Sequence, residues 1–291
     1  MTTTTTSHPA SAGALVPRTG FRRVAAYGEI GFIAAYGESV GARLVVVTGG
    51  AGGIGRAICL RLARQGHQVV ALGRTEETLR ALERDARSEG LAVVGQLCDV
   101  TDEVQVARVV GALGTVEILV NNAGVSATAP LHRTSLEEWE RHLRVNATAA
   151  FLLTRAVLPD MRKSGWGRIV SIASTAALAG APYTAAYTAA KHAMLGLTRV
   201  VAAEVAGSGV TSNAICPTFA RTPMTERSVA RISALTRRDA DEAEAALAHA
   251  APLGRLLEPE DVAAAVEFCT SDDAGSINGQ TLVLDGGGLQ A

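Results

Sequence analysis

The chain has 291 residues, of which 48% are hydrophobic and 19% charged, and 27 Lys and Arg against 28 Asp and Glu leave a formal net charge of −1. This apolar content and near-neutral charge exclude a wholly disordered chain, and the missing basic surplus argues against a nucleic-acid binder. The chain has four cysteines without a C-x-x-C spacing, at positions 59, 98, 216 and 269. They exclude a disulfide scaffold, and we expect them to be reduced and buried.

Membrane and export signals are also missing from the sequence pattern. No apolar run reaches the roughly 20 residues of a spanning helix. The first residues lack the basic start and apolar block of a secretory signal. We therefore expect a cytoplasmic protein without a membrane partner.

Residues 1–42 differ in composition from the rest of the chain. They begin with a tract of five threonines and carry Pro9, Pro17 and scattered glycines. We expect this N-terminal extension to be poorly ordered, with a functional extension as the alternative. Residues 21–40 hold enough apolar side chains to pack against the body or a neighbour.

From residue 43 onward, short apolar runs alternate with helical patterns. The expected strands are residues 44–47, 67–72, 92–97, 116–120, 168–173, 210–216 and 281–284. The expected helices are residues 54–65, 75–88, 101–113, one that begins at Ser135, 184–205 and 258–269. Strands that are apolar throughout and alternate with helices form parallel βαβ units, buried on both faces. The sequence predicts an α/β fold with one doubly wound, Rossmann-like parallel sheet in a single domain, residues 43–291.

A glycine-rich loop, residues 48–55 with the sequence TGGAGGIG, joins the first expected strand to the first expected helix. Glycine lets a backbone turn tightly and approach a phosphate closely. The helix N-terminus offers free N–H groups to the same anion. Since the loop follows a strand and opens a helix, it predicts a dinucleotide site at the carboxyl end of the sheet.

The Thr-Gly-x-x-x-Gly-x-Gly spacing resembles that of the short-chain dehydrogenase/reductase family, 3-oxoacyl reductases in particular, and the likeness continues through residues 43–291. Asn121-Asn122-Ala123-Gly124 and Asp285-Gly286-Gly287 match two further family motifs. The residues that match the family's catalytic positions are Asn146, Ser174, Tyr187 and Lys191. The cofactor contacts that the resemblance implies are Thr48, Gly49, Gly53, Ile54, Gly55, Arg74, Asp99, Val100, Asn122, Ala123, Gly124, Tyr187, Lys191, Pro217 and Thr222.

The residues after the second strand favour NADP(H) over NAD(H). An NAD enzyme usually has Asp or Glu there to bind the ribose, whereas this chain has Gly73 and then Arg74. Arg74 could pair with a 2′-phosphate. Gly52, often basic in family members that use NADP, weakens this preference, so NAD(H) stays open.

Tyr187 and Lys191 are four residues apart and therefore share a helix face. A nearby cation favours the phenolate, so we expect the pKa of Tyr187 to be lowered. The resemblance implies that Tyr187 exchanges a proton with the substrate and that Ser174 orients the substrate oxygen. It also implies that Lys191 binds the nicotinamide ribose and that Asn146 holds a water for proton relay. Tyr183 lacks a lysine four residues on and is excluded from proton transfer.

Residues 223–256 are expected to form a short helical lid over the substrate. They mix apolar side chains with arginines, among them Arg227 and Arg231, which would suit a CoA or carrier-protein thioester. Acidic residues among them, such as Glu242 and Glu244, make a plain amphipathic lid equally compatible. In the loop before the lid, Thr218 departs from the Pro-Gly of the family. No metal site is expected, because the six histidines show no metal-ligand spacing.

These observations predict an NADPH-dependent ketoreductase acting on a 3-oxoacyl thioester or a similar ketone. One alternative is an NAD-dependent dehydrogenase of a cyclic or hydroxyacyl secondary alcohol. Another is a catalytically silent dinucleotide sensor or scaffold, against which the intact catalytic set argues. The resemblance implies a homo-oligomer, either a tetramer or a dimer.

Overall fold

Seven parallel strands form the central sheet of the computed structural model, which describes residues 23–26, 29–32, 41–236 and 238–289. The strands of this sheet are β3 (Leu44–Thr48), β4 (Gln68–Gly73), β5 (Val93–Leu97), β6 (Ile118–Asn121), β7 (Gly167–Ile172), β8 (Val210–Pro217) and β9 (Thr281–Leu284). The helices are α1 (Gly53–Arg64), α2 (Glu76–Ser88), α3 (Glu103–Leu113), α4 (Leu136–Leu143), α5 (Ala149–Ser164), α6 (Ala185–Glu204), α7 (Pro223–Thr236), α8 (Ala240–Ala248) and α9 (Pro259–Thr270). The expected doubly wound α/β fold is confirmed.

The strand order is β5-β4-β3-β6-β7-β8-β9, and every neighbouring pair is parallel. The chain leaves β3 toward β5 and then returns to the other side of β3 with β6. Such a reversal opens a crevice at the carboxyl ends of the two strands, where ligands bind in open α/β sheets. The glycine loop after β3 and the Asn122 segment after β6 both lie at this point.

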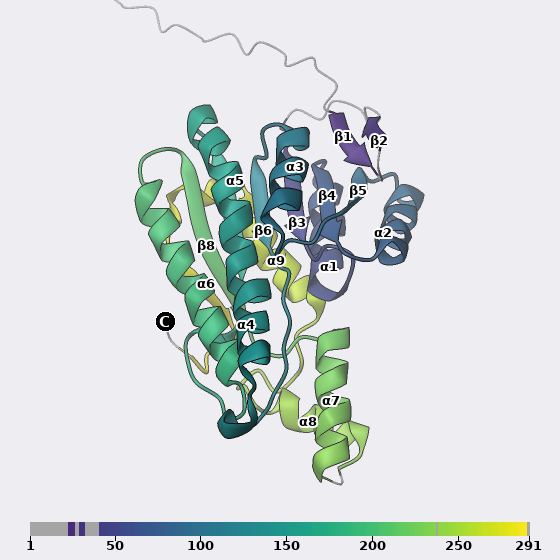
Figure 1. Cartoon of the computed structure of the whole chain (residues 1–291), viewed down its shortest axis with the longest axis vertical. Helices are drawn as coiled ribbons and strands as arrows, with labels where there is room; N and C mark the ends of the chain where they lie inside the picture. Colours follow the sequence, from purple (N-terminus) through teal and green to yellow (C-terminus); the bar gives the residue numbers. More distant parts are fainter. Residues whose placement is uncertain (1–22, 27–28, 33–40, 237, 290–291) are drawn as a thin grey trace, which may run out of the picture.

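Helices cover both faces of the sheet, as Figure 1 shows. Alternate residues of β3 enter different cores. Val45 and Val47 belong to a cluster with α1, α2 and α9, whereas Leu44 and Val46 belong to one with α3, α5 and α6. All five residues of β3 are buried, which explains why residues 44–47 are continuously apolar rather than alternating.

The helix expected to begin at Ser135 is interrupted before it reaches β7. Ser135 caps α4 by accepting the Glu138 N–H at 3.1 Å. A one-turn π-helix, Arg144–Thr148, then separates α4 from α5. Such π-turns are frequently found at functional sites, and this one contains Asn146.

One feature of the N-terminal extension differs from the sequence expectations. Two short strands within the N-terminal extension were not expected: β1 (Arg23–Ala26) and β2 (Glu29–Phe32) pair antiparallel, and β1 lies against α3 and the edge strand β5. The expectation of poor order for the remainder of residues 1–40 lies outside the described residues.

All four cysteines are free and buried, as expected. No helix among the described residues is long and apolar enough to cross a membrane.

Candidate active site

The glycine loop between β3 and α1 is shaped by positions that tolerate no side chain. Gly49 and Gly53 have φ of +63° and +50°, in the left-handed region that favours glycine. A Cβ at Gly55 would collide with the carbonyl oxygen of Gly49. The loop therefore passes close to its own helix, and the first N–H groups of α1 stay open to an anion. These features fit the pyrophosphate of a dinucleotide cofactor.

Thr48 and Asn122 lock the ends of β3 and β6 together beneath this loop. The Thr48 hydroxyl accepts the N–H groups of Asn122 and Ala123, both at 2.9 Å. The Asn122 side-chain amide donates to the carbonyl oxygens of Thr48 at 2.9 Å and Gly49 at 3.2 Å. Both residues thus connect the carboxyl ends of β3 and β6, the two strands between which the strand order reverses.

The segments after β4 and β5 contribute the expected residues for the adenosine half of a cofactor. Arg74 is exposed and has no hydrogen bond or ion pair to any other described residue. Asp99 is held in place, because its carboxylate accepts the N–H and hydroxyl of Thr101 at 3.0 and 2.7 Å. Val100, the next residue, is buried. No carboxylate ends β4, whose last residue is Gly73.

Ser174, Tyr187 and Lys191 meet next to the carboxyl ends of β7 and β8. Ser174 begins a short 3₁₀-turn after β7, and its hydroxyl accepts the Ala176 N–H at 3.1 Å. A hydrogen bond with Ser174 acts on the Tyr187 phenol and favours its ionised form, which by itself lowers the pKa. Lys191 Nζ lies 5.8 Å from the centre of the Tyr187 ring. The three side chains therefore converge on one location.

The expected direction of the Tyr187 pKa is wrong. Burial raises the pKa of the phenol, and the hydrogen bond with Ser174 opposes this only in part. Lys191 does not reverse the shift. Its ammonium donates to the carbonyl oxygen of Ile172 at 2.7 Å. Burial also lowers the pKa of Lys191 to about 8. Spacing along a helix brought the two groups together, but it did not specify how far either is removed from solvent.

Asn146 is fully buried in the π-turn and holds the chain that follows β6. Its side-chain oxygen accepts the Val125 N–H, and its amide donates to the Val125 carbonyl oxygen, both at 3.0 Å. A Cβ at Gly124 would lie 2.8 Å from Asn146 Oδ1 and 3.7 Å from Lys191 Nζ. Asn146 and Lys191 thus approach the same point of the backbone, and only glycine fits there.

The chain after β8 folds back to the glycine loop. A Cβ at Gly53 would lie 3.1 Å from Thr222 Cγ2, so Thr222 is next to the start of α1. Pro217 ends β8, and the Thr218 N–H donates to Leu284 of β9 at 3.1 Å. The departure from the family pattern at Thr218 is therefore accommodated within the sheet.

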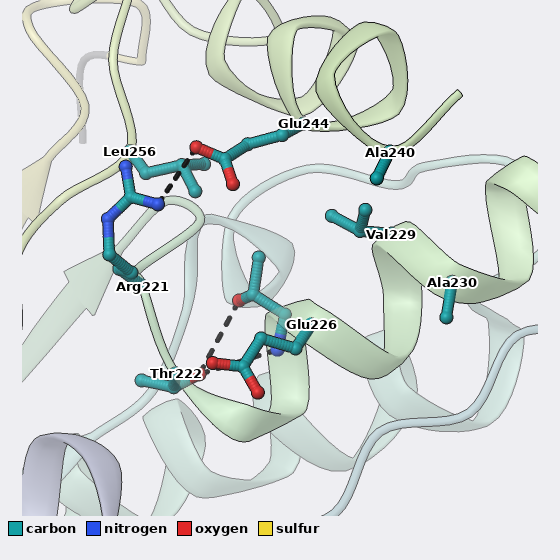
Figure 2. Close-up of a pocket in the computed structure, with 9 residues that line it drawn as sticks. Arg221, Thr222, Glu226, Val229, Ala230, Ala240, Glu244 and Leu256 are labelled. Atoms are coloured by element: carbon teal, nitrogen blue, oxygen red, sulfur yellow. Dashed lines mark hydrogen bonds and ion pairs between the residues drawn. The ribbon is translucent and has the colours of Figure 1, made fainter. Parts of the chain in front are cut away.

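The segment expected to form a lid contains α7 and α8, which project from one end of the body in Figure 1. A cavity of about 320 Å³ separates them, and Figure 2 shows Arg221 and Glu244 pointing toward each other at its rim. Arg221 pairs with Glu244 at 2.8 Å and with Glu258 at 3.2 Å. Most of the exposed surface of the lining is apolar, although five of the nine lining residues are polar or charged. The lining residues are Arg221, Thr222, Thr225, Glu226, Val229, Ala230, Ala240, Glu244 and Leu256. The cavity shares Thr222 with the expected cofactor contacts, whereas Ser174, Tyr187 and Lys191 are not among its lining residues.

The sequence reasoning missed His142. This residue is buried on α4, one turn before Asn146, and its ring meets the Tyr187 ring edge-on with centroids 6.4 Å apart. Its four-residue spacing from Asn146 was a signal that it shares that helix face. The six histidines were considered only as metal ligands, so His142 was not among the expected site residues.

The model of the short chain dehydrogenase family matches residues 43–233. The chain belongs to this family. It is 36% identical over 251 residues to a 3-oxoacyl-acyl-carrier-protein reductase of Thermotoga maritima, covering 84% of this chain and 97% of the relative. It is 35% identical over 254 residues to a D-beta-hydroxybutyrate dehydrogenase of Rhizobium meliloti, covering 84% and 98%.

Solved structures of short-chain dehydrogenases agree with this assignment. An actinorhodin polyketide ketoreductase with NADPH superposes with a TM-score of 0.82 at 33% identity, over 84% of this chain and 97% of that one. A levodione reductase superposes with a TM-score of 0.79 at 33% identity, over 84% and 96%. The chain is thus an oxidoreductase that interconverts ketone and alcohol groups with a nicotinamide dinucleotide cofactor.

Proposed function

We propose that this short-chain dehydrogenase is an NADPH-dependent ketoreductase that acts on a 3-oxoacyl thioester or a similar ketone. The observation that carries the proposal is the convergence of Ser174, Tyr187 and Lys191 beside a glycine loop shaped for a pyrophosphate. A dinucleotide sensor or scaffold needs the loop but has no use for the three side chains.

The state of Tyr187 suits the reductive direction. Burial raises the pKa of the phenol, so it carries its proton at neutral pH and can give it to a ketone oxygen. Ser174, in the turn that follows β7, would donate a hydrogen bond to the same oxygen and hold it in line. The bound cofactor supplies the hydride.

Lys191 would support the proton donor in this scheme. With a pKa of about 8, Lys191 is mainly charged at neutral pH, and its hydrogen bond to Ile172 fixes the ammonium near the phenol. A fixed cation there stabilises negative charge as the proton leaves Tyr187. Asn146 keeps Gly124 and Val125 next to Lys191, so that the backbone after β6 closes this side of the site.

Arg74 supports NADPH as the cofactor. It is exposed and lacks an ion-pair partner among the described residues, and no carboxylate at the end of β4 opposes a 2′-phosphate. A guanidinium binds phosphate with charge-assisted hydrogen bonds. The residues expected to hold the remainder of the cofactor are those of the glycine loop together with Asp99, Val100, Asn122, Pro217 and Thr222.

The lid supports an extended acyl substrate. Most of the exposed surface of the cavity between α7 and α8 is apolar, and Arg227 and Arg231 are exposed on α7. The reductase of Thermotoga maritima is named for a carrier-bound substrate, and an acetoacetyl-CoA reductase of Rhizobium meliloti is 38% identical to this chain. These relatives support a thioester, although the levodione reductase is named for a free ketone.

A substrate and cofactor panel tests the proposal. The purified chain is given NADPH or NADH with acetoacetyl-CoA, a cyclic diketone or an aryl ketone, and kcat/KM is measured from cofactor absorbance. We expect turnover of acetoacetyl-CoA with NADPH preferred. Turnover confined to the free ketones would contradict the thioester, and a clear NADH preference would contradict the cofactor. Light scattering of the same sample tests the expected dimer or tetramer.

A further inference from the structure

The segment after β6 is held by three alternate N–H groups. The Val125 N–H donates to Asn146 Oδ1 at 3.0 Å, the Ala127 N–H to His142 Nε2 at 3.0 Å, and the Ala129 N–H to the Tyr183 carbonyl oxygen at 2.9 Å. Asn146 and His142 belong to one continuous helical stretch, whereas Tyr183 precedes α6. Residues 125–129 are thereby stretched between the two helices that carry the candidate catalytic groups.

Each of the three anchors has an unusual setting. His142 and Asn146 are fully buried, and Asn146 lies in the π-turn. Tyr183 has a φ of +70°, which side chains other than glycine rarely adopt. Tyr183 lies four residues before Tyr187, and this strained backbone directs the Tyr183 carbonyl toward the Ala129 N–H. Strain of this kind persists where the surrounding structure requires it, and it concentrates at functional sites.

The contacts of His142 define its protonation. Its Nε2 accepts a hydrogen bond from the Ala127 N–H, so that nitrogen carries no proton. Its Nδ1 lies 2.8 Å from the Glu138 carbonyl oxygen and 3.2 Å from Glu138 Oε1, two acceptors that require a proton on Nδ1. Arg141 in turn holds the Glu138 carboxylate with two contacts of 3.2 Å. His142 is therefore a neutral ring with one defined tautomer and one defined orientation.

We propose that His142 is a positioning residue that fixes residues 125–129 as a wall of the substrate site against Tyr187. The proposal rests on the proposed function, because the wall matters only where a substrate meets the Tyr187 phenol. His142 acts through two contacts, the Ala127 N–H on one side and the edge of the Tyr187 ring on the other. His142 thereby fixes the position of residues 125–129 relative to the Tyr187 phenol, which donates the proton.

A histidine is specifically suited to this place. The position is fully buried and needs an acceptor that reaches Ala127 while an opposite donor satisfies Glu138. An apolar side chain of similar volume would fill the space but leave the partly buried Ala127 N–H without its hydrogen-bond partner. The wall would then be free to move relative to Tyr187, and the ketone would meet the phenol less often in a reactive geometry.

Two substitutions that differ by one methylene test this role. In His142→Gln the side-chain oxygen can occupy the place of Nε2 and keep the bond to Ala127. In His142→Asn the amide reaches only as far as Nδ1 and loses that bond. His192→Asn is the matched control, because His192 is exposed beside Lys191 and its ring hydrogen-bonds to the carbonyl oxygen of Thr188 in its own helix.

Two readouts are compared on the full chain. The first is amide hydrogen exchange of the peptide that spans residues 124–130, and the second is kcat and KM for acetoacetyl-CoA. The Kd for NADPH is measured separately. In His142→Asn we expect about tenfold faster exchange of this peptide and about tenfold lower kcat/KM for the ketone, with NADPH Kd within about twofold of wild type. His142→Gln and His192→Asn are expected to stay within about threefold of wild type in both readouts.

The outcomes separate the two proposals. Exchange in His142→Asn that equals wild type would overturn the positioning role, and so would equal losses in the Gln and Asn variants. A parallel loss of NADPH binding and thermal stability would show a general structural defect instead, and would overturn it too. If wild type reduces none of the ketones, the proposed function fails, while the exchange data still decide whether His142 holds the segment. Should His142→Asn fail to fold, His142→Leu takes its place in the same measurements.

Discussion

At the amino end of the seven-stranded sheet, Arg43 and Arg168 lie against Trp166, whereas at the carboxyl end Lys191 lies beside Tyr187. The guanidinium carbons of Arg43 and Arg168 are 3.4 and 4.4 Å from the centre of the Trp166 ring. Lys191 Nζ is 5.8 Å from the Tyr187 ring centre. Both ends therefore combine cations with an aromatic ring in a largely buried place.

The two ends differ in how the charges are compensated. Arg43 pairs with Asp272 at 3.0 Å and with Glu117 at 3.5 Å, and the Trp166 N–H donates to Asp272 at 3.0 Å. Arg168 donates to the carbonyl oxygens of three residues, Gly167, Gly209 and Ser271. Lys191 has one hydrogen bond, to Ile172, and no carboxylate partner among the described residues.

This difference assigns separate tasks to the two ends. Paired charges and satisfied carbonyl groups tie β3, β6, β7 and α9 together at the amino end. At the carboxyl end, burial without a counter-charge moves pKa values, raising that of Tyr187 and lowering that of Lys191. Perturbed titratable groups of this kind are typical of active sites. Substitutions at the amino end should therefore change stability, and those at the carboxyl end should change turnover.

Arg168→Met gives the largest expected change in stability. It removes a buried guanidinium and leaves three carbonyl oxygens without this donor, so we expect a loss of about 2–4 kcal/mol, or roughly 5–10 °C in Tm. Turnover well below the new Tm should stay near that of wild type. Arg64→Met is the control, because its pair with Glu89 is exposed and such pairs contribute about 1 kcal/mol or less. A large fall in the kcat of Arg168→Met at low temperature would contradict the proposal that the amino end of the sheet serves stability and not turnover.

Lys191→Met should stabilise the fold and reduce turnover. Burial lowers the pKa of Lys191 to about 8 in the folded protein from its ordinary 10.5, so folding below pH 8 carries the cost of burying a charge. We expect the variant to melt about 3–6 °C above wild type at pH 7. The folded protein loses the proton first as pH rises, so the advantage should fade between pH 8 and 10.5. A constant difference across that window would contradict the assigned direction.

Two substitutions near the expected 2′-phosphate site should change cofactor preference with little effect on stability. Gly52 has an extended backbone, with φ of −150°, and a Cβ there would meet no atom within 4 Å. We therefore expect Gly52→Arg to raise the NADPH-to-NADH ratio of kcat/KM by about threefold to tenfold, and Arg74→Ser to lower it by about tenfold. Arg87→Ser, in the last turn of α2, is the control. Equal ratios for Arg74→Ser and this control would remove Arg74 from the cofactor site.

The sequence predicted the strands and most helices because their determinants are local. The run at residues 44–47 is apolar and β-branched, and glycines follow it, so β3 was expected almost at its observed bounds. The conformation of the glycine loop depends on its own glycines, which can be recognised in the sequence. The Tyr187 and Lys191 pair shares a helix face whatever surrounds the helix.

What the sequence did not predict depends on contacts between distant segments. The π-turn at Asn146 and the position of α5 follow from packing on the sheet rather than from capping or periodicity. The role of His142 depends on Ala127, a loop residue 15 positions away. The sign of the Tyr187 pKa depends on burial, which four-residue spacing does not measure. Lys191 could not be assigned to the Ile172 carbonyl before β7 and α6 were placed together.

The most direct test of the central claim is the turnover of Tyr187→Phe, which removes one hydroxyl from the carboxyl end and leaves the ring against His142. We expect kcat for NADPH-dependent reduction of acetoacetyl-CoA to fall by about 10²–10⁴-fold, with Tm and NADPH Kd close to wild type. This result would show that the phenol proton serves the reaction and not the fold. Turnover equal to that of wild type in Tyr187→Phe would contradict the account.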